Sequence, residues 1–252
     1  MDFDGKRVLV TGGARGIGRA TARAFAERGA RVAVGYHNNE TASRATLASL
    51  AGSGHLTVAG DLAEPETARH VVDTAVEGLG GLDVLVNSAG IGLDQRLDEI
   101  DYEAWQASWQ RTLAVNLLAP ANTCYLAARH MMAHGGGHIV NVSSRGAFRG
   151  EPEMPAYGAS KAGLNAMSQS LAQYLAPHRI AVAVVAPGFV DTDMARSWLD
   201  SERGDAIRGQ SPLKRVATPE EVAYAVLFLA SEGAFFSTGA IIDVNGASYL
   251  RT

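Results

Sequence analysis

Two side chains suited to proton transfer lie four positions apart in the second half of the chain. Tyr157 and Lys161 are one turn apart at the start of a predicted helix, so they share one face. A tyrosine with its ordinary pKa near 10 is a poor base, but a neighbouring ammonium lowers that pKa. Ser144 lies 13 residues before Tyr157, just after a predicted strand, and could donate a hydrogen bond to a carbonyl oxygen. Together these residues predict acid–base chemistry on a carbonyl or hydroxyl group.

A glycine-rich turn near the start of the chain predicts a phosphate-binding site. Gly12, Gly16 and Gly18 directly follow a predicted strand and open a predicted helix. Glycines there let the backbone approach a pyrophosphate, and the amino-terminal end of the helix favours its negative charge. Because the pattern stands in a strand–turn–helix context, we favour dinucleotide binding over glycines that serve only close packing.

The end of the second predicted strand bears on which dinucleotide binds. NAD sites usually place an Asp or Glu there, where it binds the ribose 2′-hydroxyl. This chain carries Tyr36, His37 and Asn38 instead, and the first acid that follows is Glu40. Arg15, His37 and Asn38 could donate hydrogen bonds to a 2′-phosphate, which a carboxylate would repel. We expect NADP(H) as the preferred cofactor, with NAD(H) as the alternative.

The elements that must position these residues alternate between short apolar runs and longer helical patterns. The runs are rich in Val and Ile, as in parallel strands covered on both faces. We expect strands at residues 7–10, 31–34, 56–59, 84–87, 138–142, 180–185 and 240–244. We expect helices at residues 16–27, 40–50, 65–79, 105–134 with a break inside, 157–175 and 219–229. This order predicts an α/β fold: a single Rossmann-type domain over residues 1–252, with a doubly wound parallel sheet of about seven strands and helices on both faces.

One long stretch, residues 188–210, shows no regular pattern. Loops of this length in compact domains are commonly lids or binding loops, so we expect a substrate loop at about residues 188–212. An apolar wall or lid of the pocket is expected from Phe148, Met154, Met194, Trp198 and Leu199. The pocket is expected to be lined by residues 91–97, 145–154 and 189–210. Arg149, Glu151 and Glu153 could supply polarity there, but we favour their interpretation as solvated loop charges.

Composition and charge exclude several classes of protein. The 252 residues are 47% apolar and 19% charged, which excludes intrinsic disorder. The net charge is −4 with no basic run, so we expect no nucleic-acid partner. The chain lacks a signal-peptide pattern and an apolar run of about 20 residues, so we expect a cytoplasmic protein without a membrane partner. Cys124 is the single cysteine and the histidines show no metal-ligand spacing, so we expect no disulfide and no metal.

Several motifs together resemble those of the short-chain dehydrogenase/reductase family, over about residues 5–246. They are the turn at residues 11–18, Asp61-Leu62, residues 87–90, Asn116, Ser143-Ser144, residues 157–161, Pro187-Gly188 and Thr192. The resemblance implies an enzyme that interconverts a ketone and a secondary alcohol by hydride transfer with NAD(P). Tyr157 would be the general acid for reduction and the base for oxidation, and Ser144 would orient the substrate oxygen. Lys161 would tune Tyr157 and bind the nicotinamide ribose, while Asn116 would bind a water that links Lys161 to solvent.

The resemblance also implies a set of cofactor-binding residues. Asp61 would meet the adenine, Asn87 and Gly90 the adenosine side, and Thr192 the carboxamide. The full set is Gly12, Arg15, Gly16, Ile17, Gly18, Tyr36, His37, Asn38, Asp61, Leu62, Asn87, Ala89, Gly90, Tyr157, Lys161, Pro187, Gly188, Val190 and Thr192.

Within the family, the chain is most similar to 3-oxoacyl-carrier-protein reductases, which dock an acidic carrier protein with basic side chains. Residues 130–137 contain no Lys or Arg, and Gln173 stands where those reductases place an arginine, although Arg129 lies nearby. We therefore expect an NADP(H)-dependent oxidoreductase acting on a small or medium, mostly apolar ketone or secondary alcohol. The alternatives are a reductase of 3-oxoacyl thioesters on a carrier protein or CoA, and a non-catalytic cofactor-sensing protein. The family further implies a homotetramer, built on the helices around residues 116–129 and 157–175 and on residues 239–246.

Overall fold

The computed structural model describes residues 1–251 and contains a seven-stranded sheet in the order β3-β2-β1-β4-β5-β6-β7. All neighbouring strands pair in parallel. The strands are β1 (Arg7–Thr11), β2 (Arg31–Tyr36), β3 (Leu56–Ala59), β4 (Val84–Asn87), β5 (Gly137–Val142), β6 (Ile180–Pro187) and β7 (Ile241–Val244). The predicted doubly wound fold is confirmed. The last residue of the predicted domain, Thr252, lies outside the described residues.

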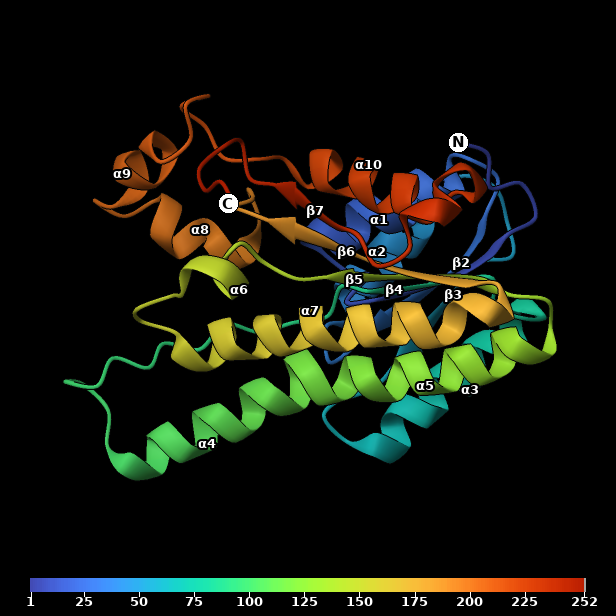
Figure 1. Cartoon of the computed structure of the whole chain (residues 1–252), viewed down its shortest axis with the longest axis horizontal. Coiled ribbons are helices and arrows are strands. Elements are labelled where there is room, and N and C mark those ends of the chain that lie inside the picture. The colour runs from blue at the N-terminus through green and yellow to red at the C-terminus, as the bar shows by residue number, and fades with distance from the viewer. Residues whose placement is uncertain (252) are drawn as a thin grey trace.

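Helices cover both faces of the sheet (Figure 1). One face packs against α1 (Gly16–Ala26), α2 (Glu40–Ala48) and α10 (Pro219–Leu229), and the other against α3 (Pro65–Leu79), α5 (Ala119–Ala133) and α7 (Pro155–Leu175). Side chains alternate between the two cores along each strand, so Val8 and Val10 pack toward α1 and α10 while Leu9 packs toward α3. No helix within residues 1–251 has the length and apolar character needed to span a membrane.

The predicted break in the helix at residues 105–134 is confirmed. α4 (Tyr102–Leu113) passes into α5 through a π-helical turn, η1 (Ala114–Leu118). Shorter elements complete the chain: α6 (Gly146–Arg149), η2 (Ala176–His178) and η3 (Glu232–Ser237).

The expectation that residues 188–210 are irregular is wrong. They contain two short helices, α8 (Asp193–Leu199) and α9 (Gly204–Gly209), which lie together at one end of the sheet near α6 (Figure 1). Helices this short are stabilised by tertiary packing rather than by their own periodicity. Here Ala195, Leu199 and Ile207 are buried against one another. Two turns of helix are too short to give a clear apolar period in the sequence.

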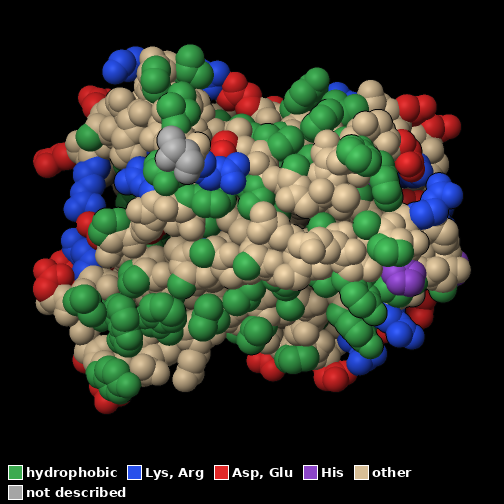
Figure 2. All heavy atoms as spheres, in the orientation of Figure 1, with side chains coloured by type: hydrophobic (Ala, Val, Ile, Leu, Met, Phe, Trp, Pro, Cys, Tyr) green, Lys and Arg blue, Asp and Glu red, His purple; other side chains and the backbone are tan. Residues whose placement is uncertain are grey.

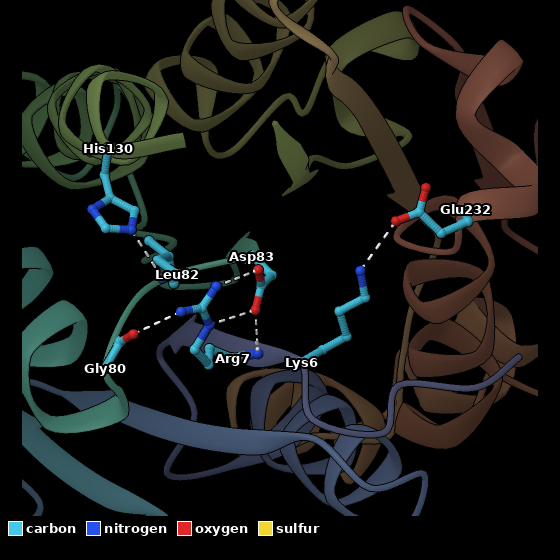
Figure 3. Close-up of polar contacts among 7 residues, drawn as sticks. All are labelled: Lys6, Arg7, Gly80, Leu82, Asp83, His130 and Glu232. Atoms are coloured by element: carbon cyan, nitrogen blue, oxygen red, sulfur yellow. Dashed lines mark hydrogen bonds and ion pairs between the residues drawn. The ribbon is translucent and has the colours of Figure 1, made fainter. Parts of the chain in front are cut away.

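At the opposite end of the sheet, an ion pair joins the amino-terminal end of β1 to the residue before β4 (Figure 3). Arg7 Nε and Nη2 each donate to the carboxylate of Asp83 at 2.7 Å, and the Arg7 backbone N–H donates to it at 2.8 Å. Although burial opposes ionisation, these bonds hold the pKa of Asp83 below its ordinary value. A second pair, Lys6 with Glu232, connects the same edge to η3.

Candidate active site and cofactor cavity

The turn between β1 and α1 lies at the point where the strand order reverses, between β1 and β4. Ligands of doubly wound sheets bind at this point, beyond the carboxyl ends of the strands. Gly12 has a φ of +66°, and a Cβ there would lie 2.8 Å from the Ala89 backbone. A Cβ on Gly18 would lie 2.2 Å from the Gly12 carbonyl oxygen. Glycine at these two positions therefore lets the turn, the start of α1 and the loop after β4 come together.

A cavity of about 300 Å³ opens over this turn, and we call it the cofactor cavity. Most residues of the predicted cofactor set line it: Gly12, Arg15, Gly16, Ile17, Gly18, Tyr36, His37, Asn38, Asp61, Leu62, Ala89, Gly90 and Thr192. Its glycine floor at a helix amino terminus and its polar far end fit the pyrophosphate and the adenosine part of a dinucleotide.

At the end of the cofactor cavity away from the glycine turn, charged side chains form ion pairs that the sequence did not indicate. Arg111, from α4, contacts the Asp61 carboxylate at 2.9 and 3.1 Å, and His37 lies 3.6 Å from it. Although burial opposes ionisation, Arg111 and His37 hold the pKa of Asp61 below its ordinary value. The Arg15 guanidinium lines the same cavity and has no ion pair with any of residues 1–251. The Arg15 guanidinium is thus free to bind an anion, whereas the charge of the Asp61 carboxylate is already balanced by Arg111.

Asn87 lies outside the cofactor cavity, unlike its neighbours in the predicted set. Its side chain is buried: the amide donates to Asn141 Oδ1 at 2.9 Å and accepts from Thr123 Oγ1 at 2.8 Å. These bonds tie β4 to β5 and α5. The structure therefore places the Asn87 side chain in a packing role beneath the site.

A second cavity, of about 350 Å³, adjoins the first and contains Ser144, Tyr157 and Lys161; we call it the substrate cavity. Ser144 lies just beyond the end of β5, and Tyr157 and Lys161 lie on the first two turns of α7. Of the predicted cofactor set, Pro187, Gly188 and Val190 line this cavity rather than the first. The two cavities share five lining residues: Ile17, Ser88, Gly90, Thr192 and Met194.

Tyr157 and Ser144 lie together in the substrate cavity. Burial raises the pKa of Tyr157 above 10, the Ser144 side chain opposes this rise, and the nearby Glu151 carboxylate adds to it. In the chain alone, Lys161 does not offset this rise. Lys161 Nζ lies 5.8 Å from the tyrosine ring centroid and donates to the Val142 carbonyl oxygen at 2.9 Å. Burial also lowers the pKa of Lys161 itself to about 8.

Asn116 occupies the π-helical turn and is fully buried. Its amide pairs with the Ile91 backbone, accepting from the N–H at 2.9 Å and donating to the carbonyl at 2.8 Å. A Cβ on Gly90 would lie 3.4 Å from Asn116 Oδ1 and 3.5 Å from Lys161 Nζ, so both polar groups flank Gly90. π-Helical turns often occur at functional sites. This one brings Asn116 close to Lys161, and its Val115 lines the cofactor cavity, whereas Asn116 itself lines neither cavity.

The walls of the substrate cavity only partly match expectation. Met154, Met194 and Trp198 line it, together with Phe189, whereas Leu199 is buried in the core of the α8–α9 segment. Phe148 lies outside the cavity, with the Arg251 guanidinium 4.4 Å from its ring centroid.

Besides Lys161, three charged residues line this cavity: Asp94, Arg145 and Glu151, all from the segments expected to form the pocket. The expectation of Glu151 as a solvated charge is wrong, because it is half-buried in the cavity wall and burial raises its pKa. Arg145 is 3% exposed, donates to the side chains of Gln210 and Ser248, and stacks over Phe189. The hydrogen-bond partners of Arg145 lie 65 and 103 residues away, so the sequence did not predict these contacts.

The sheet, the glycine turn and the Ser–Tyr–Lys cavity define a dinucleotide-dependent oxidoreductase of CH–OH and C=O groups. Comparisons with known proteins agree: residues 12–247 match a family model described as enoyl-(acyl carrier protein) reductase. The chain belongs to the short-chain dehydrogenase/reductase family.

Individual relatives cover nearly the whole chain. A 3-oxoacyl-(acyl-carrier-protein) reductase of Chlamydia trachomatis is 36% identical over 243 residues, 96% of each chain. A cis-4-hydroxycyclohexanecarboxylate dehydrogenase of Sinomonas cyclohexanicum is 39% identical over 97% of this chain and 96% of its own. Among solved structures, a short-chain dehydrogenase of Burkholderia cenocepacia in complex with NADP superposes with a TM-score of 0.89 at 35% identity, covering 98% of this chain and 99% of its own.

Proposed function

We propose that this chain interconverts a small ketone and its secondary alcohol with NADP(H). The observation that carries the proposal is that Tyr157 and Ser144 line a single cavity, which shares a wall with the glycine turn. A proton donor and a site for a hydride carrier are thereby adjacent, which carbonyl reduction requires. The α8–α9 segment, within the substrate loop at residues 188–212, covers the substrate cavity through Met194, Ala195 and Trp198.

In reduction, Tyr157 donates its proton to the carbonyl oxygen, and in oxidation it takes the proton back. Its raised pKa keeps the phenol protonated, and therefore able to donate, at neutral pH. Ser144 donates a hydrogen bond to the same oxygen and so orients it. When bound, NADPH supplies the hydride to the carbonyl carbon. The ammonium of Lys161 stabilises negative charge on Tyr157 and binds the cofactor ribose, and Asn116 holds a water that connects Lys161 with solvent.

The cofactor preference rests on the far end of the cofactor cavity. Arg15, His37 and Asn38 are exposed there, and the one acid among the predicted set, Asp61, is neutralised by Arg111. A 2′-phosphate therefore meets available donors rather than a free carboxylate, which favours NADP(H) over NAD(H). The similar Burkholderia cenocepacia dehydrogenase, which binds NADP, supports this preference.

A second candidate function is the reduction of 3-oxoacyl thioesters, which the full-length similarity to the Chlamydia trachomatis reductase favours. To act on a carrier-bound thioester, the chain would have to dock an acidic carrier protein, and this docking needs basic side chains. Arg129 on α5 is exposed, but Gln173, which is exposed near the end of α7, carries no charge. Only one of these two docking positions therefore carries a basic side chain, which supports a small ketone as the substrate over a carrier-bound thioester.

The test starts with fluorescence titrations of the protein with NADPH and NADH, followed by NADPH oxidation on a ketone panel that includes acetoacetyl-CoA. We expect tighter binding of NADPH and turnover of simple ketones but not of the thioester. Tyr157→Phe should lower kcat by about 10²–10⁴-fold with unchanged NADPH affinity, because only the proton donor is lost. Preferential turnover of the thioester would establish the second candidate. Cofactor binding without any turnover would instead support a cofactor-sensing protein.

We further propose that the chain is a homotetramer. Leu118, Tyr125 and Tyr174 are exposed on η1, α5 and α7, and Figure 2 shows hydrophobic side chains spread over this face with few charges at its centre. Tyr224 and Phe228 are likewise exposed on α10. Two separate apolar faces can form two different interfaces between copies of the chain, as a homotetramer with two kinds of interface requires. Sedimentation equilibrium should give a mass about four times 26.4 kDa; a monomer would contradict the proposal.

A further inference from the structure

The substrate cavity contains a carboxylate that the proposed mechanism does not use. Glu151 lies between α6 and α7, and its side chain lines the cavity together with Ser144 and Tyr157. It is half-buried, yet among residues 1–251 its carboxylate has no hydrogen-bond partner and no ion pair. Withdrawing a carboxylate from water without a partner costs free energy, so a polar group of a ligand is the natural partner.

Gly146 fixes the position of Glu151 relative to the reacting groups. The Gly146 N–H donates to Ser144 Oγ at 3.0 Å. A Cβ on Gly146 would lie 2.7 Å from Glu151 Cγ and 2.8 Å from Glu151 Oε1, so the glutamate side chain occupies the space that a larger residue would fill. Ser144 and Glu151 therefore flank a single glycine and line the same cavity. A substrate whose oxygen reaches Ser144 lies next to this carboxylate.

The charges around the cavity decide what kind of group suits Glu151. Arg145 and Arg149 act on Glu151 in the direction of a lower pKa, but burial outweighs them. Of the charged side chains, Arg145, Lys161, Asp94 and Glu151 line the cavity, whereas Arg149 lies outside it. A substrate ammonium would meet the two cations, and a substrate carboxylate would meet the two acids. A neutral hydrogen-bond donor avoids both repulsions, and the hydroxyl group is the simplest such donor.

We propose that Glu151 determines substrate specificity by accepting a hydrogen bond from a second hydroxyl group, so that the substrates are hydroxyketones and the corresponding diols. The inference rests on the proposed function and refines its substrate class. The apolar side chains of Met154, Phe189 and Trp198 line the same cavity and contact the carbon skeleton. This substrate is more polar than the mostly apolar ketone that the sequence led us to expect.

The test compares ketones that differ by a single hydroxyl group, namely 2-hydroxycyclohexanone with cyclohexanone and 3-hydroxy-2-butanone with 2-butanone. With NADPH, we expect the wild-type protein to prefer the hydroxylated member of each pair by about 10- to 100-fold in kcat/KM, the effect of one hydrogen bond to a charged group. Glu151→Met, of similar length but without an acceptor, should abolish the preference, so that the two members of each pair have equal kcat/KM.

Three further variants control the experiment. Glu151→Gln keeps an acceptor oxygen and should retain most of the preference. Gly146→Ala keeps the N–H that bonds Ser144 but displaces the Glu151 side chain, so it should lower the preference as Glu151→Met does. Glu153 lies between α6 and α7 like Glu151, but it is outside the cavity and pairs with Arg203 at 2.8 Å. Glu153→Gln should therefore leave the preference unchanged.

Equal kcat/KM for both members of each pair in the wild type would overturn the inference and leave the proposed function standing. So would a Glu151→Met variant that slows both members alike. A Glu151→Met effect confined to amino-substituted ketones would assign the carboxylate to an ammonium and overturn the hydroxyl class. Absence of NADPH oxidation with every ketone would overturn the proposed function and this inference with it.

Discussion

Lys161 shows how burial sets the pH range in which a single residue can act. Its ammonium is buried, and in residues 1–251 it has a carbonyl oxygen as hydrogen-bond partner but no carboxylate. Burial disfavours the charged form, so the pKa falls from 10.5 to about 8. The lysine is therefore a cation at neutral pH and loses its charge in mildly alkaline solution.

This shift predicts the alkaline limb of the pH profile. Since kcat/KM for NADPH reports groups on the free enzyme, it should fall as the pH rises through about 8, where Lys161 loses its proton. Tyr157, whose pKa is raised, is still protonated there. Steady-state kinetics between about pH 6.5 and 9.5 measures the limb. If Lys161→Met kept the same limb in its residual activity, another group would be responsible.

At the residue scale, the sequence predicted those groups whose spacing is local. Tyr157 and Lys161 share one helix, and Ser144 lies on the strand–loop junction just before it, so their meeting follows from short-range geometry. The Arg111–Asp61 and Arg145–Gln210 contacts join segments 50 and 65 residues apart, and no periodicity encodes them. The direction of the Tyr157 pKa shift also escaped prediction, because spacing gives proximity but not burial.

At the scale of elements, the β1–α1 turn and the loop after β4 come into close backbone contact beside the cofactor cavity. Gly12→Ala would place a Cβ 2.8 Å from the Ala89 backbone at a φ of +66°, so the two segments must separate. We expect NADPH affinity to fall at least about tenfold, equivalent to roughly 1.4 kcal/mol. Fluorescence titration measures the affinity.

Gly233→Ala provides the matched control, because a Cβ at Gly233 meets nothing within 4 Å. That variant should bind NADPH as the wild type does. Equal affinity in Gly12→Ala would mean that the turn and the loop move apart without disturbing the cavity, contrary to the role assigned here.

The elements that sequence reasoning predicted best are those with the strongest periodicity. β3, β4, α3 and α10 have the predicted bounds, since their apolar patterns and flanking signals coincide. α8 and α9 were missed because two turns of helix give too few residues for a period, and their burial depends on Phe189 and Val216 outside the helices.

At the scale of the whole molecule, the Arg7–Asp83 pair ties the central strands at the end remote from both cavities. Its atoms are about one-quarter exposed, so the pair is worth about 1–2 kcal/mol rather than the larger value of a buried pair. Because the folded-state pKa of Asp83 is depressed, its contribution is present above the ordinary Asp pKa of 3.8 and is lost as the pH falls through the lower folded value.

Asp83→Asn should therefore lower the free energy of unfolding at pH 7 by about 1–2 kcal/mol. Below about pH 4, the difference from the wild type should shrink. Urea unfolding at several pH values between 7 and 3 measures both effects. Glu66→Gln removes an exposed acid from α3 and should leave the curve unchanged. A constant difference between wild type and Asp83→Asn at all pH values would show that the ionisation of Asp83 is not the cause.

The five residues common to the cofactor and substrate cavities have a thermodynamic consequence. A ligand in one cavity touches groups that also form the other, so the two binding equilibria are linked. Linkage is reciprocal: a compound that tightens NADPH binding tenfold is itself bound ten times more tightly by the NADPH complex. Compounds that enter the substrate cavity can thus be found at equilibrium, from their effect on cofactor affinity. Tyr157→Phe, which should retain cofactor binding, would allow that screen to proceed without consuming its ligands.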